Sequence, residues 1–480
     1  MAYRIESPAT SAQQDTRHLL HPWADLSALG RETPTVIVDA HGTRVTDAEG
    51  RTYLDAIGGM WCVTVGYGRR EIADAIRDQA LRMPFYTPFG ADHEDPLSMT
   101  NEPAAALGAR LAELAPGDLK RVHLTTCGST AVESALRFAH YYFGATGRPQ
   151  KRRIVTRRDA YHGSTYLAAS VSGKAWDRTC FHYDDTIVHH LSSPNPYRRP
   201  AGMSVDAFCA MLVDEFDTLV ATLGADRIAC FIAEPILASG GVIAPPPGYL
   251  AAIRERCRRH DILYISDEVV TGFGRVGHFF ASHAHFGIEP DMIVVAKGLT
   301  SGYQPLGAVL ISERLVAAVS GERAYGDGVF TNGFTYSGHP VACAAALANI
   351  DLMERERICE HVRDVGPYFI RQLETLRRFP IVGDVRGDHL MACIECTSSA
   401  GATGALPTPA DIAIAQRVDR HCEEMGLLVR PYESMCILSP PLTVARADID
   451  EICAILATAL EHTQCELEES APVREENETC

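Results

Sequence analysis

The chain lacks several features that mark large classes of proteins. It has no run of 18 apolar residues, and no charged, apolar and small-residue leader precedes Gly30, so we expect neither a membrane span nor a signal peptide. Basic residues are outnumbered, because 44 lysines and arginines face 61 acidic residues, which gives a net charge of −17. Nucleic acids select basic faces, so we expect no nucleic-acid partner. These absences predict a cytoplasmic protein.

Two further motif classes are missing. The 15 cysteines stand as single residues within apolar runs, which favours buried free thiols over a disulfide framework or a zinc site. We predict no metal site. No Gly-x-Gly-x-x-Gly turn joins a first strand to a helix, which argues against a dinucleotide-binding oxidoreductase.

What is present is an alternation of strands and helices. With 46% hydrophobic residues in 480 positions, the chain can bury a large core and is expected to form more than one domain. The alternation from Arg121 onward predicts a largely parallel sheet covered by helices, an α/β fold. Strands are expected at 35–38, 51–55, 122–124, 154–156 and 228–233, and helices at 70–83, 129–143, 205–223 and 341–355.

Lys297 and Asp267 each end an apolar, strand-like run, and they lie 30 residues apart. Open α/β sheets bind ligands beyond the carboxyl ends of their strands, so both side chains are expected in one crevice. Pyridoxal phosphate needs a lysine that holds it as a Schiff base and a carboxylate that keeps its ring nitrogen protonated. Alone, Lys297 is typical of a surface lysine and Asp267 of a helix cap or metal ligand. Together they indicate a pyridoxal phosphate enzyme.

From about Pro34 to about Leu460 the chain resembles the class III aminotransferases, a family of fold-type I pyridoxal phosphate enzymes. Within that family it is most similar to the amine or ω-amino acid:pyruvate branch. Besides the Asp267 and Lys297 blocks, the resemblance is carried by the motifs at 59–68 (GMWCVTVGYG), 161–165 (YHGST), 233–235 (AEP) and 333–340 (GFTYSGHP). It implies a large domain with a mostly parallel sheet and a smaller α+β domain.

We predict domain boundaries on this basis. An N-terminal arm and part of the small domain span 1–75, the large cofactor-binding domain spans 76–340, and the C-terminal small domain spans 341–465. The first thirty residues are expected to pack on a partner subunit. The last segment, 466–480, holds six glutamates against one arginine and is predicted to be a disordered acidic tail.

The start of a helix after Thr125 is suited to the cofactor's phosphate, because unpaired N–H groups there favour an anion. An ordinary serine N-cap is the alternative. The resemblance favours the phosphate and implies Gly128, Ser129 and Thr130 as ligands, although the family usually has glutamate in place of Thr130. It places Cys127 beside the phosphate as a small packing residue rather than a nucleophile. It also implies that Thr335 reaches the phosphate from the other subunit, and thus a homodimer or tetramer with shared active sites.

The remaining cofactor contacts also follow from the resemblance. Tyr161 and His162 occupy the positions where an aromatic ring stacks on one face of the cofactor, and Val269 is expected to close the opposite face. A core tyrosine is the alternative for Tyr161. Glu234 ends a buried apolar strand, where an unpaired carboxylate would be costly, so we expect it to hydrogen-bond near the ring without taking part in chemistry.

Arg430 matches the family's arginine that binds the carboxylate of the keto acid. An arginine suits this role because its guanidinium can pair with a carboxylate through two hydrogen bonds. A surface arginine is the alternative. Relatives that use 2-oxoglutarate have the motif Glu-Pro-x-x-x-Glu, whose second glutamate pairs with this arginine. Here Ser239 occupies that place, which favours pyruvate as the acceptor.

The substrate pocket is predicted to be apolar. Trp61, Phe85, Tyr86 and Phe89 match family positions that line it, and Phe334 is expected to enter from the neighbouring subunit. Aromatic residues at this spacing are otherwise typical of plain core. Such a pocket would accept an amine or ω-amino acid with a hydrophobic body.

The predicted function is a ping-pong transamination from an amine or ω-amino acid to pyruvate, giving alanine. Lys297 serves as Schiff-base lysine and as acid and base, and Asp267 holds the ring charge. Three alternatives stay open: a class III aminomutase, a dialkylglycine-type decarboxylase, and a non-catalytic binding protein on this fold. The natural donor, the preferred enantiomer and the choice between dimer and tetramer are left undetermined.

Overall fold

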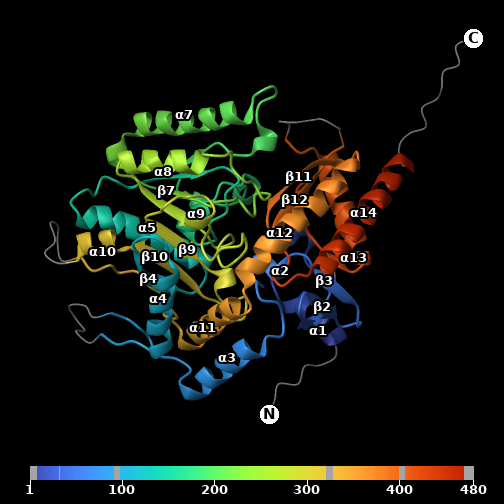
Figure 1. Cartoon of the computed structure of the whole chain (residues 1–480), viewed down its shortest axis with the longest axis horizontal. Coiled ribbons are helices and arrows are strands. Elements are labelled where there is room, and N and C mark those ends of the chain that lie inside the picture. The colour runs from blue at the N-terminus through green and yellow to red at the C-terminus, as the bar shows by residue number, and fades with distance from the viewer. Residues whose placement is uncertain (1–7, 32, 91–97, 321–327, 399–405, 470–480) are drawn as a thin grey trace, which may run out of the picture.

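One large sheet and two small sheets organise the molecule. The computed structural model describes residues 8–31, 33–90, 98–320, 328–398 and 406–469 (Figure 1). Figure 1 shows the large sheet and its helices on the left and the small sheets on the right, with helix α11 (Pro340–Arg355) running below and between them. Within the described ranges, every helix is too short or too polar to cross a lipid bilayer.

The large sheet has seven strands in the order β4-β10-β9-β8-β7-β5-β6. Their bounds are β4 Leu119–Thr125, β5 Arg153–Arg157, β6 Val188–Leu191, β7 Ile228–Ala233, β8 Leu263–Asp267, β9 Met292–Val295 and β10 Gly307–Ser312. β5 pairs in parallel with β6 and β7, β7 with β8, and β8 with β9. Only β10 runs antiparallel to its neighbours, so the predicted largely parallel sheet is confirmed.

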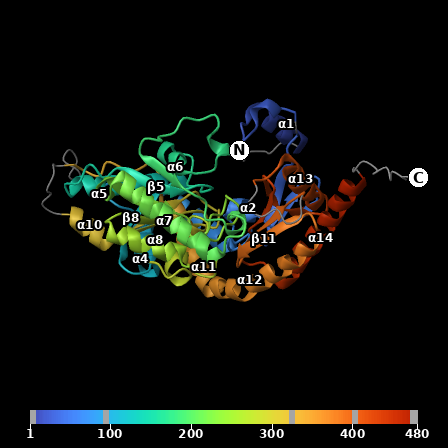
Figure 2. The ribbon, with the colours of Figure 1, turned by 90° about the horizontal axis from the view of Figure 1, so that it is seen from above.

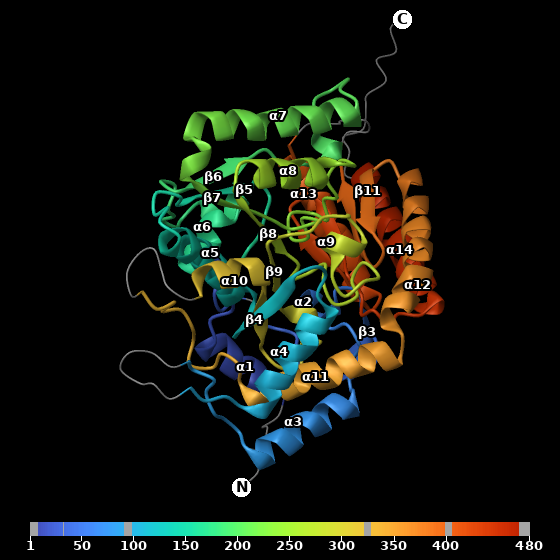
Figure 3. The ribbon, with the colours of Figure 1, turned by 60° about the vertical axis from the view of Figure 1, so that its left-hand side comes forward.

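Helices cover both faces of this sheet, which explains why its strands read as continuous apolar runs. In β8, Ile265 packs under α5 (Gly128–Ala145), whereas Tyr264 packs under α7 (Val205–Leu223) and α8 (Tyr249–Arg259). Alternate side chains of a strand point to opposite faces, so both layers are filled. Figure 3 shows α7 and α8 at one end of the large sheet and α4 (Glu102–Leu114), α3 (Arg70–Arg82) and α11 at the other.

The two small sheets join segments from both ends of the chain. One has the order β1-β2-β3-β13 and the other β11-β12-β15-β14. Their bounds are β1 Ile37–His41, β2 Arg44–Asp47, β3 Thr52–Asp55, β11 Val382–Asp388, β12 Met391–Cys396, β13 Leu427–Leu428, β14 Arg430–Tyr432 and β15 Met435–Leu438. Because β3 pairs with β13, the N-terminal strands belong to the same region as the C-terminal third.

Helices α12 (Ile358–Glu374), α13 (Pro409–Glu424) and α14 (Arg446–Glu469) lie against the small sheets. Seen from above, α1 (Pro8–His18) lies on the opposite side of the molecule from α12 (Figure 2). The shorter helices are α2 Gly58–Trp61, α6 Tyr166–Val171, α9 Ala281–Ala284 and α10 Glu313–Val319. The 3-10 turns are η1 Leu26–Ala28, η2 Trp176–Arg178, η3 Pro196–Arg198, η4 Ala225–Arg227, η5 Lys297–Leu299 and η6 Thr375–Arg378.

Most of the predicted elements coincide with observed ones, including β7 and α7 at their full lengths. The first strand is shifted: it was expected at 35–38 and spans Ile37–His41, followed by a turn at Gly42 that the sequence reading missed. Helix α14 continues to Glu469, into the segment predicted to be a disordered tail, and 470–480 lie outside the described residues. The domain boundaries at 75, 340 and 465 stay predictions.

Two short spacings that are typical of metal and dinucleotide sites occur in the chain. A Cys-x-x-Cys spacing does occur, at Cys393 and Cys396, but it lies along β12, where residues three apart face opposite sides of the sheet. The described cysteines are all free thiols. A Gly-x-Gly-x-x-Gly spacing also occurs, at 272–277, but it forms a turn packed against the small-sheet region, where Gly274 approaches Leu442 and Gly277 approaches Arg363. It does not open a helix.

Candidate active site

A cavity of about 750 Å³ opens at the carboxyl ends of the large-sheet strands, and both Lys297 and Asp267 line it. Asp267 is the last residue of β8 and pairs in register with Val294 of β9. Lys297 follows β9 directly. The expectation that neighbouring parallel strands bring both side chains to one crevice agrees with this geometry.

Lys297 is held in an unusual backbone conformation. Its φ is +43°, in the left-handed region that side chains other than glycine rarely adopt. Asn349 of α11 fixes the turn by donating to the carbonyl oxygens of Gly298, at 2.9 Å, and Leu299, at 3.1 Å. Burial lowers the pKa of the Lys297 amine, while Cys62 and the carboxylates of Asp267 and Glu234 oppose that shift. A desolvated lysine amine is suited to act as a nucleophile and a base.

Asp267 is 4% exposed and has two firm partners. Its Oδ2 lies 2.7 Å from Nδ1 of His162, and its Oδ1 accepts a hydrogen bond from the Val269 N–H at 3.1 Å. His162, expected beside the cofactor face, lines the cavity while its Nδ1 contacts the aspartate, and its Nε2 is buried with no partner among the described residues. The pair fixes the direction in which the Asp267 carboxylate points into the cavity.

Glu234 lines the cavity, and both of its carboxylate oxygens accept hydrogen bonds from backbone N–H groups. Oε1 accepts from the N–H of Tyr161 at 3.0 Å, and Oε2 accepts from that of Ala238 at 2.9 Å. Burial raises the pKa of Glu234, and these two hydrogen bonds oppose the shift. The side chain therefore links the Tyr161 loop to the end of β7. This agrees with the expectation that a carboxylate buried here is hydrogen-bonded.

The start of α5 forms an anion-binding end in the cavity. Gly128 and Ser129 line it, and within the described chain their backbone N–H groups have no hydrogen-bond partner. Thr130 does not share this role, because its hydroxyl donates to the Cys127 carbonyl at 2.9 Å and accepts from the Cys127 N–H at 3.0 Å. Cys127 is the N-cap and itself lines the cavity.

A glycine closes this end of the site. Gly163 has a φ of +129°, and a Cβ there would lie 2.6 Å from Oγ and 2.7 Å from Cα of Ser129. The absence of a side chain lets the loop from Tyr161 to Ser164 close on the helix start, where the Ser164 N–H donates to Ser129 Oγ at 3.0 Å. This packing leaves a narrow cradle at the helix end.

Cationic side chains occupy another part of the cavity wall. Arg430 begins β14, is half-buried, and forms no ion pair within the described residues. Burial lowers the pKa of its guanidinium. Ser239, at the position where a pairing glutamate was considered, accepts a hydrogen bond from Lys174 at 3.2 Å. The arginine thus faces the cavity without a partner carboxylate from the described part of the chain.

The family assignment follows from comparison with known proteins. The class-III aminotransferase family matches residues 27–460. The chain belongs to that family. A putrescine–pyruvate aminotransferase of Pseudomonas aeruginosa is 35% identical over 447 residues, which cover 93% of this chain and 94% of the relative. A diaminobutyrate–2-oxoglutarate transaminase of Halomonas elongata is 36% identical, over 87% of this chain and 88% of the relative.

Solved structures agree. An ω-transaminase from Pseudomonas jessenii, solved in complex with PMP, superposes with a TM-score of 0.90 at 31% identity and covers 96% of this chain and 99% of its own. The predicted family, fold type and enzyme class are therefore confirmed: this protein is a class III aminotransferase, a transaminase.

Not every site residue predicted for this class III aminotransferase lies in the cavity of the single chain. Trp61, Tyr161 and Val269 line it. The residues that do not line it are Thr130, Phe85, Tyr86, Phe89, Phe334 and Thr335. Phe85, Tyr86 and Phe89 are 38–54% exposed, and Phe85 packs edge-on against Tyr336 with ring centroids 5.6 Å apart. These two segments therefore lie together on the surface of the chain.

Lys174 and Trp23 are among the cavity-wall residues that the sequence did not predict. Lys174 is 3% exposed, pairs with Asp177 at 3.3 Å, and lies 4.0 Å from the ring centre of Tyr432. Trp23, from the N-terminal segment, packs edge-on against Tyr161 at 5.7 Å. A lone lysine after a short helix and a tryptophan in a segment without periodicity carry no signal of a site; only the tertiary fold brings them there.

Proposed function

We propose that this enzyme transfers the amino group of an amine or ω-amino acid to pyruvate, giving alanine, in a ping-pong cycle of two half-reactions. The observation that carries the proposal is one cavity whose wall combines Lys297, Asp267 and an arginine, Arg430, free of a partner carboxylate among the described residues. The first two supply the chemistry of transamination. The third supplies a carboxylate anchor.

Pyridoxal phosphate is the proposed cofactor, and the observed residues fit it. Lys297 would hold it covalently and Asp267 would face its ring nitrogen, since both line the cavity. The unpaired N–H groups of Gly128 and Ser129, beside the cradle that a Cβ at Gly163 would fill, suit its phosphate. Tyr161 and Val269 would contact its ring. When bound, the cofactor supplies an aldehyde that links to amines and a ring that withdraws electrons from the substrate carbon.

The side chains then have distinct tasks. The Lys297 amine, with its pKa lowered by burial, takes the proton from the donor carbon and later returns it. The Asp267 carboxylate, fixed by His162 at 2.7 Å, holds a negative charge where the ring nitrogen would lie. Arg430 orients the keto acid by pairing with its carboxylate.

Pyruvate is the proposed acceptor because the wall near Arg430 lacks the gating glutamate. A gating glutamate pairs with the arginine and releases it when a dicarboxylate substrate enters. Ser239 has no carboxylate and accepts a hydrogen bond from Lys174. The named substrates of the two relatives differ, pyruvate in one and 2-oxoglutarate in the other. The acceptor is therefore the point that an experiment must decide.

We also propose that the enzyme works as a homodimer with shared sites. Thr335, predicted to reach the phosphate, is exposed and outside the cavity of its own chain, as are Tyr336 and the aromatic residues at 85–89. Exposed aromatic side chains gathered in one place are typical of an interface. In the dimer, Thr335 and Phe334 of each subunit would complete the site of the other.

A donor panel tests the proposed reaction. Putrescine, β-alanine, 4-aminobutyrate, taurine and an aryl amine are each incubated with pyruvate or with 2-oxoglutarate, and alanine and glutamate are quantified. We expect alanine from pyruvate to form faster than glutamate from 2-oxoglutarate with at least one donor. Glutamate alone would overturn the acceptor, and an isomerised donor or released carbon dioxide would identify a mutase or a decarboxylase.

Lys297→Ala tests the central residue. Turnover should fall by at least about a thousandfold, because both the covalent link and the proton carrier are lost, while the protein still binds cofactor without the absorbance of the lysine-linked form. Lys120→Ala, at an exposed lysine that bonds the Ala112 carbonyl, is the control and should keep full turnover. Near-normal turnover of Lys297→Ala would remove that residue from its role.

A further inference from the structure

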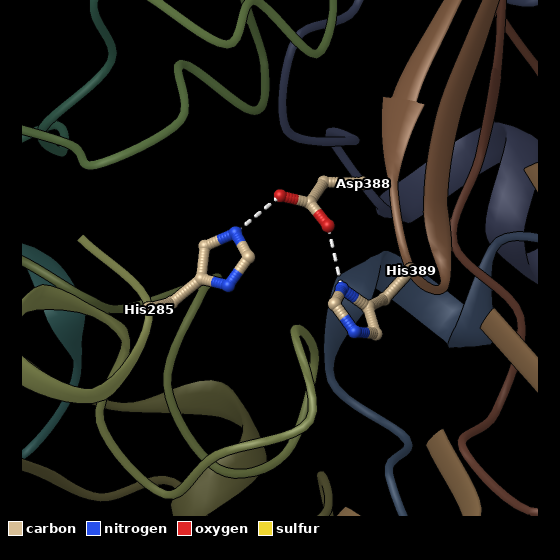
Figure 4. A group of neighbouring side chains, drawn as sticks. All are labelled: His285, Asp388 and His389. Carbon is tan, nitrogen blue, oxygen red and sulfur yellow. Dashed lines mark hydrogen bonds and ion pairs between the residues drawn. The ribbon is translucent and has the colours of Figure 1, made fainter. Parts of the chain in front are cut away.

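A cluster of metal-ligand side chains lies outside the active-site cavity. His285 follows the short helix α9 near the large sheet, and Asp388 and His389 form the turn between β11 and β12 of a small sheet. Figure 4 shows the Asp388 carboxylate between the two imidazole rings, which approach it from these separate segments. None of the three lines the cavity that holds Lys297.

The geometry of the group is close to that of a metal site. His285 Nε2 lies 2.6 Å from Asp388 Oδ2, and His389 Nδ1 lies 2.5 Å from Asp388 Oδ1. One ligand atom from each residue falls within 4.8 Å of the other two. In a tetrahedral zinc site with bonds of about 2.0–2.1 Å, ligand atoms are separated by about 3.4 Å. Separations of up to 4.8 Å are therefore within side-chain adjustment of the spacing that one ion requires.

Two backbone features hold His389 at this turn. Its φ is +49°, in the left-handed region, which histidine tolerates better than most side chains other than glycine. Helix α12 passes close by at Gly366, where an added Cβ would lie 2.7 Å from His389 Cα. The glycine therefore lets the turn approach the helix, and the turn presents the imidazole toward His285.

A third histidine lies near the group. The ring of His278 lies 6.5 Å from that of His285, and the rings of His285 and His389 are 5.6 Å apart. The guanidinium of Arg363, which lies near His278, donates to the Gly277 carbonyl. Two imidazoles and one carboxylate form a donor set that suits Zn²⁺ and its first-row neighbours.

We propose that His285, Asp388 and His389 bind one divalent transition-metal ion of the zinc class. The ion joins the turn of the small sheet to the segment between β8 and β9, which begins directly after Asp267. Its role is structural, since the group lies outside the catalytic cavity. The competing arrangement is a hydrogen-bonded His-Asp-His group without metal.

Zinc binding to the holoenzyme tests the site. Tag-free, cofactor-loaded protein is treated with a chelator, dialysed, and titrated with ZnCl₂ against a chromophoric competitor. We expect one tight equivalent per chain. His285→Gln should weaken that equivalent at least about tenfold, as should His389→Gly, a change that keeps the left-handed turn. His283→Gln is the matched control, because His283 is an exposed histidine two residues from His285, and it should bind as the wild type does.

Cobalt and heating give independent readouts. Co²⁺ should produce visible absorbance bands of a tetrahedral site in the wild type and in His283→Gln, but not in His285→Gln. Zn²⁺ should raise the thermal midpoint of the wild type and of His283→Gln, but not that of His285→Gln or His389→Gly. Cofactor absorbance and circular dichroism verify that each variant is folded. If a histidine variant does not fold, Asp388→Asn is tested in its place. Equal zinc affinity in the wild type and all variants would overturn the proposal.

Discussion

At the scale of single residues, the chemistry of the site depends on which ionisable side chains are desolvated and which of them keep a hydrogen-bond partner. Lys297 is partly buried and its pKa is lowered by burial, whereas Asp267 is more deeply buried and is held by His162 and a backbone N–H. A buried carboxylate with hydrogen-bond donors can stay charged, and a desolvated amine can become neutral. The cavity therefore offers a fixed charge and a proton carrier at neighbouring strand ends.

Arg430 provides the sharpest test of substrate binding at this scale. Arg430→Ala should raise the KM for pyruvate about tenfold to a hundredfold, because a charge-assisted pair to the acceptor is lost. The KM for a carboxylate-free amine should change little. Steady-state kinetics with both substrates varied measures the two values separately.

The control for that measurement is Arg258→Ala, at an exposed arginine of α8 that pairs with Glu255 at 2.9 Å. It should leave both KM values unchanged. Equal increases for pyruvate and amine in Arg430→Ala would mean that the arginine shapes the cavity without anchoring the carboxylate.

At the scale of elements, the active site depends on how the loop before α6 closes on the start of α5. Gly163→Ala places a Cβ 2.6 Å from Ser129 Oγ at a φ of +129°. Overpacking of this kind costs about 1–3 kcal/mol, and we expect it to appear as a loss of cofactor affinity of about tenfold or more, since the cradle must open. Equilibrium dialysis with pyridoxal phosphate measures that affinity.

Gly108→Ala is the matched change in an element away from the site. Gly108 lies within α4, where an added Cβ meets nothing within 4 Å, so alanine should stabilise the helix by about 0.5–1 kcal/mol. Cofactor affinity should not change. If both alanine variants bound cofactor equally well, close contact at Gly163 would not be what forms the cradle.

Helix α13 carries a pH-dependent stability term. Burial, with the neighbouring Glu423 carboxylate, raises the pKa of Asp419 from 3.8 to about 7. Between these two values the folded protein holds the proton that the unfolded chain releases, so stability falls as pH rises across this window and stays low above it.

Asp419→Asn should therefore raise the thermal midpoint at about pH 8, by an amount that corresponds to roughly 1–3 kcal/mol after allowance for solvent screening. The gain should shrink toward pH 5. Thermal unfolding across this range measures it, and Asp351→Asn, at an exposed aspartate of α11, should show no such trend. A gain that is equal at both pH values would contradict the raised pKa.

At the scale of the whole molecule, the single chain leaves part of the predicted site unfilled. Phe334, Thr335 and the aromatic residues at 85–89 lie outside its own cavity, yet they gather near Tyr336, which is 60% exposed. A second copy of the chain is the partner that would give this surface a function. The proposed dimer and the proposed active site are therefore linked.

Tyr336→Asp should separate the subunits and lower turnover together, because a buried unpaired charge at an interface is costly. Light scattering after size-exclusion chromatography gives the mass, and activity at matched concentration gives turnover. Met211→Asp, on the outer helix α7 (Figures 1 and 3), is the control and should change neither. A monomer with full activity would refute shared sites.

Sequence alone determined the elements whose signals are local. Continuous apolar runs bounded by breakers defined β7, β8 and β9, and helical periodicity defined α3 and α7. The placement of Asp267 and Lys297 at strand ends followed from the same runs. Because parallel strands end at one edge, the pairing of the two side chains in one cavity was predictable.

Only the tertiary structure decided what depends on distant segments. His162 bonds to Asp267 across 105 positions, Lys174 reaches Ser239 across 65, and Asp388 meets His285 across 103. No periodicity links such residues, since their approach is set by sheet order and by the packing of loops on helices. Local sequence patterns thus determined the strands and the positions of Asp267 and Lys297, whereas the tertiary fold determined which residues contact them.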